Sequence, residues 1–188
     1  MKQLTQYIQE KLHISKYKLK YKVGDIIENY KLKNKEYDLI CCISEDQIED
    51  HIPRFMIKDE IMKYTLCGDI CIDCKDENDI NGYENTNDWI DKFSECCSEN
   101  MICAANEIRK KYGEKAYLPA IGELSKLNEN INLIDKKLNK SIIGFTFDSS
   151  TQYSEDKAYY VEIGKNKVST SYTMYTGNII AFVKIWNN

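Results

Sequence analysis

The chain has 188 residues, of which 43% are hydrophobic and 30% charged, with only two prolines and eight glycines. This composition supplies a packed core and excludes a disordered or fibrous chain. The sequence has no apolar run long enough for a transmembrane helix, and its first residues lack the apolar core of a secretory signal peptide. We therefore predict no membrane association and, without an export signal, a reduced cytoplasmic origin.

The charge is unevenly distributed along the chain. Residues 1–22 hold six lysines and one glutamate, a net charge of +5, whereas the whole chain carries −4, which leaves −9 for residues 23–188. Within this arm, Tyr7, Ile8 and Leu12 fall on one face of a short helix predicted over residues 3–13. So short a helix is marginal in water, so these three side chains are predicted to anchor it on another surface. The alternative is a solvated helix and linker.

The body is predicted to mix strands and helices. Short apolar runs predict strands at residues 37–43, 54–58, 158–163, 167–173 and 179–186. The last run is almost entirely apolar, which is typical of a central strand buried on both faces. An acidic loop is expected over residues 73–88, followed by a helix capped by Thr86 and a second helix from about Glu95 to Tyr112, which Gly113 ends. Pro119 suits the first turn of a further helix that continues to Leu138.

The cysteines are predicted to be free thiols. Two adjacent pairs, at residues 41–42 and 96–97, cannot bridge within themselves without strain. Cys67, Cys71 and Cys74 have a spacing that could hold zinc together with a fourth ligand. A second such pair and a nearby histidine are missing, so we favour thiols beside an acidic loop, with no metal and no cofactor.

Catalytic motifs are absent from the sequence. It has two histidines and lacks a GxSxG elbow, a Walker loop and an HExxH pair, so we predict that the protein is not an enzyme. The run from Ser169 to Tyr175 is instead rich in tyrosine and hydroxyl side chains, the chemistry that binding surfaces favour. An ordinary β-hairpin edge is the alternative.

Several short blocks occur in a characteristic order, and we call them the signature blocks. They are Tyr117-Leu118-Pro119, Gly122-Glu123-Leu124, Ser149-Ser150-Thr151 and Ala158-Tyr159-Tyr160-Val161. The order resembles a DUF1566-like family found in Bacteroidales and in crAss-like bacteriophages. The resemblance implies an α+β, C-type lectin-like fold: antiparallel strands with two to three helices, forming residues 23–188 behind the basic arm. Phe147-Asp148 stands where the family has tryptophan, and the calcium-binding triplets of sugar-binding lectins are absent.

The resemblance also implies a function and a binding face. It predicts a non-enzymatic virion protein made in the host cytoplasm: a head fibre, decoration or tail-associated protein. The arm would dock on other virion proteins, and the body would bind a host-surface glycan or protein, or a neighbouring subunit, within a homo-oligomer or larger assembly. Nucleic acid and membrane are not expected partners. A purely structural virion subunit, a cellular adhesin and a polysaccharide-acting enzyme remain alternatives.

The predicted binding face lies at the last hairpin, which this fold would bring beside the loop near Ser154. The proposed contact residues are Tyr153, Ser154, Tyr172, Met174, Tyr175 and Asn178. Tyr159 and Tyr160 are neighbours on a strand, so one should face the core and the other should not.

Overall fold

The computed structural model describes residues 20–66, 73–96, 103–165 and 167–185. Eight strands are present in these residues: β1 (Ile26–Leu32), β2 (Lys35–Ile43), β3 (Arg54–Thr65), β4 (Ala116–Tyr117), β5 (Thr146–Ser154), β6 (Lys157–Glu162), β7 (Val168–Tyr172) and β8 (Thr176–Lys184). The same residues contain the α-helices α2 (Gly82–Cys96), α3 (Ala104–Tyr112), α4 (Ile121–Glu129) and α5 (Ile131–Ile134), and the 3-10 turns η1 (Glu45–Gln47) and η2 (Asp135–Lys137). The predicted arm helix, with Tyr7, Ile8 and Leu12, lies outside the described residues.

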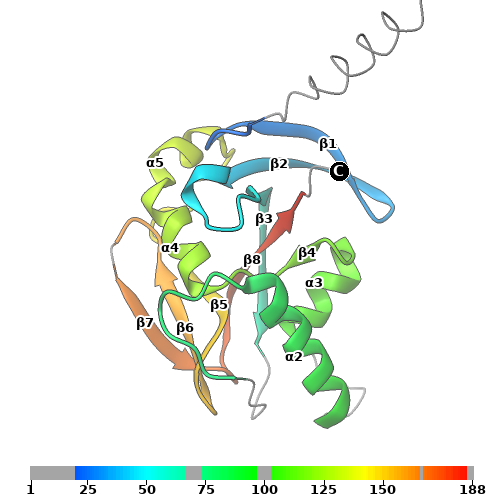
Figure 1. Ribbon diagram of the computed structural model, residues 1–188, viewed down its shortest axis with the longest axis vertical. Coiled ribbons are helices and arrows are strands. Elements are labelled where there is room, and N and C mark those ends of the chain that lie inside the picture. Colours follow the sequence, from blue (N-terminus) through cyan, green and yellow to red (C-terminus); the bar gives the residue numbers. More distant parts are fainter. Residues whose placement is uncertain (1–19, 67–72, 97–102, 166, 186–188) are drawn as a thin grey trace, which may run out of the picture.

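All eight strands belong to one sheet, in the order β1-β2-β3-β8-β5-β6-β7, with β4 paired to β8 (Figure 1). The pairs are antiparallel except for β5 and β8, which run parallel. The α+β class, dominated by an antiparallel sheet, is confirmed. Within the described residues the sheet carries four α-helices, where two to three were expected.

The centre of the sheet is buried on both faces, as predicted for the last strand. Ile180 and Phe182 of β8 pack in the cluster that includes α4 and α5, and Ile179 and Ala181 pack on the opposite face with α3. Figure 1 shows these helices on opposite sides of the β3 and β8 strands. Alternation of side chains along a strand produces this division.

The predicted helix boundaries need correction. Thr86 does not cap a helix, because α2 begins at Gly82, and the Thr86 hydroxyl donates to the Gly82 carbonyl at 2.7 Å. A Cβ at Gly82 would lie only 2.5 Å from the Ala120 nitrogen. The absence of a side chain at Gly82 therefore allows the start of α2 to pack directly against the backbone at Ala120. The next helix begins at Ala104 rather than near residue 95, and ends as expected at Gly113, which has φ of 90°.

The helix predicted after Pro119 is broken at Asn130 between α4 and α5. The Asn130 side chain turns away to donate to the Cys42 carbonyl at 2.9 Å, and so ties the break to β2. Among the described residues, no helix is long and apolar enough to cross a membrane.

The prediction that all cysteines are free thiols is wrong at Cys103. Cys41 and Cys42 are buried free thiols, and burial raises the pKa of Cys41 to about 12. Cys74 is exposed, and Cys103 is disulfide-bonded. Adjacency prevents a bridge within a pair and says nothing against a bridge between distant cysteines. Cys67 and Cys71 lie outside the described residues, and within those residues no three potential ligands cluster as a metal site.

Candidate binding site

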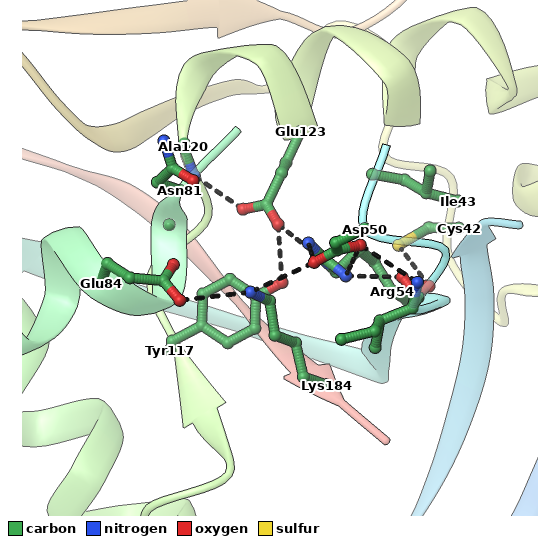
Figure 2. A network of polar contacts seen from close by, with 12 residues as sticks. Cys42, Ile43, Asp50, Arg54, Asn81, Glu84, Tyr117, Ala120, Glu123 and Lys184 are labelled. Carbon is green, nitrogen blue, oxygen red and sulfur yellow. Dashed lines mark hydrogen bonds and ion pairs between the residues drawn. The ribbon is translucent and has the colours of Figure 1, made fainter. Parts of the chain in front are cut away.

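Three of the signature blocks, at residues 117–119, 122–124 and 149–151, form a buried support rather than a binding surface. Glu123 is fully buried and accepts hydrogen bonds from Arg54 Nε at 2.7 Å, the Tyr117 hydroxyl at 2.8 Å and the Ala120 nitrogen at 3.0 Å. Figure 2 shows these groups converging on its carboxylate. Burial raises the pKa of Glu123, and the Arg54 guanidinium opposes that shift. Arg54 also pairs with Asp50 at 2.8 Å, so every charge at this centre has a partner.

A second buried network attaches β5 to the helices. The Thr151 hydroxyl donates to Asp79 at 2.8 Å and accepts from the Ile121 nitrogen at 2.9 Å, at the start of α4. Trp89 of α2 donates to the Ser150 carbonyl at 2.9 Å. The hydroxyl block is therefore buried because its polar groups are satisfied internally, and it holds two helices against the sheet.

Three of the predicted contact residues come together at the end of the edge strand β7. Tyr172, Met174 and Tyr175 are 42%, 56% and 61% exposed, an unusual concentration of large apolar side chains in solvent. The rings of Tyr172 and Tyr175 make an edge-to-face contact, with centroids 5.6 Å apart, across the turn closed by the Tyr175 N–H and the Tyr172 carbonyl. We call these three residues the tyrosine edge.

The other predicted contact residues lie elsewhere or support the backbone. Tyr153 is 51% exposed, but its ring meets Tyr159, 5.4 Å away, rather than the tyrosine edge. The Ser154 hydroxyl donates to Asp156 in the β5–β6 turn at 2.9 Å. Asn178 donates to the Thr146 carbonyl at 3.1 Å, which joins β8 to β5. Of the six predicted contact residues, three therefore lie together in the tyrosine edge and three lie elsewhere.

Tyr159 and Tyr160 separate as their alternation requires, although both are partly buried. Tyr159 packs against the core cluster that includes α4, whereas Tyr160 lines a cavity next to the tyrosine edge. This cavity has a volume of about 270 Å³. Its lining residues come from β5, β6, β7, β8 and the turn before β8: Thr146, Asp148, Tyr160, Ser171, Tyr175, Thr176 and Gly177.

Of the residues that line this cavity, only Tyr175 was a predicted contact residue, and Asp148 is the most informative of those that the sequence did not reveal. It is only 8% exposed, and its carboxylate makes no hydrogen bond or ion pair within the part of the chain that the structure describes. Burial raises its pKa to about 6. A Cβ on Gly177 would fall 1.7 Å from Asp148 Oδ2, so the carboxylate lies directly over a glycine backbone. The one available signal was the departure at Phe147-Asp148 from the family pattern.

A larger cavity of about 480 Å³ lies between α4 and the loop that precedes α2. Glu77, Lys126, Glu129 and Lys167 contribute both signs of charge to its lining, and Lys126 pairs with Glu129 at 3.8 Å. This mixture resembles an ordinary solvated surface. The Asp148 cavity is smaller but contains a buried acid without a counter-charge, so it is the stronger candidate for a binding site.

Among solved structures, the chain is similar to a fimbrial protein from Bacteroides ovatus. The TM-score is 0.63 at 12% sequence identity, and the match covers 88% of this chain and 49% of that chain. This chain therefore spans about half the length of the fimbrial protein. At this identity the likeness shows a shared fold. No protein-family model matches the sequence, and no curated protein matches it either.

Proposed function

We propose that the protein is a non-enzymatic subunit of a surface assembly and that it binds through the tyrosine edge. The observation that carries this proposal is the exposure of Tyr172, Met174 and Tyr175 side by side, next to a cavity with an unpaired carboxylate. Tyrosine supplies a large amphipathic contact area with little loss of conformational freedom, which suits a contact surface. A single acid among hydroxyls and phenols offers no acid–base pair, so binding suits the cavity better than hydrolysis.

The assembly that we favour is a bacteriophage virion, with a C-type lectin-like body that displays the tyrosine edge. The order of the signature blocks supports this assignment. The opposite charges of the arm and the body, +5 and −9, support a separate docking role for residues 1–22. In this proposal the arm attaches the subunit to the particle, and the tyrosine edge contacts the host surface or a neighbouring subunit.

A fimbria-like subunit on a bacterial surface is the second candidate. Two observations favour it: the fold shared with a fimbrial protein and the disulfide at Cys103. Disulfides persist in oxidising surroundings such as the cell surface and are rare in the cytosol. Mass spectrometry of purified virions and of proteins shaved from intact cells distinguishes the two, because each candidate places the chain in one sample.

The role of the tyrosine edge is tested by measuring how well variants of this surface are incorporated into the assembly that contains the chain. We expect Tyr175→Ala to reduce incorporation or attachment, whereas Tyr153→Ala, a similarly exposed tyrosine outside the edge, should leave both unchanged. Equal behaviour of the two variants would contradict the proposed contact surface. Loss of folding, read from the melting temperature, would instead show that Tyr175 supports the core.

A further inference from the structure

The polar side chains that line the Asp148 cavity are a carboxylate, which only accepts hydrogen bonds, and hydroxyl groups, which can accept or donate them. Its polar side chains are one carboxylate, the hydroxyls of Thr146, Ser171 and Thr176, and the phenols of two tyrosines. Hydroxyls can accept as well as donate, and the lining has no side-chain N–H group. A ligand that donates several hydrogen bonds and accepts none complements such a lining.

The charge and the walls of the cavity also suit a cation. Asp148 is a buried acid with no counter-charge in the described part of the chain, and Lys157 of the adjacent strand lies over the Tyr172 ring at 4.9 Å instead. The rings of Tyr160 and Tyr175 line the same space. Aromatic faces attract cations, and the attraction is stronger where water is excluded.

We propose that this cavity receives the side-chain ammonium of a lysine from a neighbouring protein. The ammonium is compact and has three donors and no acceptor, which matches a carboxylate surrounded by hydroxyls. A planar guanidinium gains most when it contacts both carboxylate oxygens, and Oδ2 of Asp148 lies against the Gly177 backbone. The lysine stem would run between the tyrosine rings toward the exposed tyrosine edge.

The inference rests on the proposed contact role of the tyrosine edge, because that surface argues for a protein as the source of the lysine. Tyr175 lines the cavity and its ring contacts the Tyr172 ring, and a partner larger than a free amine would cover both exposed rings. The acidic body, with −9 over residues 23–188, favours the approach of a basic partner. We therefore expect the partner protein to present a lysine at the centre of the surface that contacts the tyrosine edge.

Titration of the full chain with Nα-acetyl-lysine N-methylamide, followed by NMR, tests the inference. Saturable shifts are expected for resonances of the cavity, with no such shifts for the Nε-acetylated analogue, which lacks the charge. Asp148→Asn should weaken binding by about 10- to 100-fold, the range for a lost charged hydrogen bond. Glu155→Gln removes an exposed acid at the far end of β5 and should leave binding unchanged. A melting curve confirms that each variant is folded.

The affinity should also fall between pH 7.5 and pH 5, because burial holds the pKa of Asp148 at about 6 and protonation removes its charge. Tyr160 and Tyr175 are the other titratable groups in the lining. Equal binding of the acetylated analogue, or unchanged binding to Asp148→Asn, would overturn the inference. Tighter binding of glucosamine than of blocked lysine would overturn it in favour of an amino sugar.

The two proposals fail separately. If blocked lysine does not bind but Tyr175→Ala still lowers incorporation, the lysine inference is wrong and the tyrosine edge stands as the contact surface. If blocked lysine binds at Asp148 and neither Tyr175→Ala nor Asp148→Asn affects any assembly, the cavity binds cations but the proposed function is wrong.

Discussion

Glu123 and Asp148 are both buried acids whose pKa is raised by burial, yet their surroundings differ in one respect. Glu123 is surrounded by donors from three parts of the chain, including the Arg54 guanidinium. Asp148 has no such partner in the described residues and borders a cavity. A buried acid that is fully paired holds elements together, whereas an unpaired acid at the surface of a cavity is available to a ligand. Burial is common to both acids. The presence of hydrogen-bonding and charged partners distinguishes the structural acid Glu123 from the candidate site residue Asp148.

The largest effect is expected where the paired acid loses its partner. Arg54→Met should lower the free energy of unfolding by about 3–5 kcal/mol, because it leaves Glu123 buried without a counter-charge. Urea denaturation measures the loss. Adding Glu123→Gln to this variant should recover part of the stability, since the uncompensated charge is then gone. A loss below about 1 kcal/mol in the single variant would show that the pair is not a structural centre.

Removal of the unpaired acid Asp148 should have the opposite effect and stabilise the folded protein at neutral pH. Asp148 has a folded pKa of about 6 against an ordinary value of 3.8, so the folded state binds its proton more tightly than the unfolded state. The stability that this proton provides is present below about pH 4 and is lost as the pH rises toward 6. Asp148→Asn should therefore be more stable than the parent at pH 7.5, by up to about 3 kcal/mol, and similar near pH 3.5.

Thermal unfolding across that pH range checks the stability prediction for Asp148. Glu155→Gln is the matched control, because it removes an exposed acid that follows the other end of β5 and leaves the buried acid in place. A pH-independent difference between parent and Asp148→Asn would mean that the carboxylate has a partner in solution.

A smaller loss is expected at Gly177. A Cβ there would collide with Asp148 Oδ2, so Gly177→Ala should destabilise the protein by about 1–3 kcal/mol by overpacking. In an Asp148→Ala background the collision is removed and the same change should be nearly neutral. A double-mutant cycle by chemical denaturation measures this coupling. Additive losses would show that the strain at Gly177 arises elsewhere.

The smallest effect on stability belongs to the tyrosine edge. Tyr172→Ala and Tyr175→Ala should change the free energy of unfolding by no more than about 0.5 kcal/mol, because both side chains are exposed. Either change should nevertheless weaken attachment by roughly 1–4 kcal/mol if the edge is a contact surface. Paired measurements of melting temperature and attachment check this prediction. Unfolding of both variants would place these tyrosines among the structural residues.

Hydrophobic periodicity and composition were sufficient to predict the features that depend on neighbouring residues in the sequence. The apolar run at residues 179–186 marked the buried central strand, and the density of tyrosine and hydroxyl residues marked the exposed end of β7. Contacts between distant segments determine the remainder. Thr86 sits within a helix because Gly82 packs against Ala120, and no local pattern records that approach. Asp148 becomes a site residue only because Gly177, 29 positions away, leaves room for its carboxylate.

The position of β8 in the sheet has a consequence for the way the chain folds. It is the last described strand in sequence, yet it pairs with β3, β4 and β5 in the middle of the sheet. Until it is in place, β3 and β5 each expose an unpaired edge, and no strand joins the two halves of the sheet. Closing such long loops is slow, and exposed edges invite pairing between chains. During synthesis, the native sheet therefore cannot form until β8 has left the ribosome, and the chain is most prone to aggregation up to that moment.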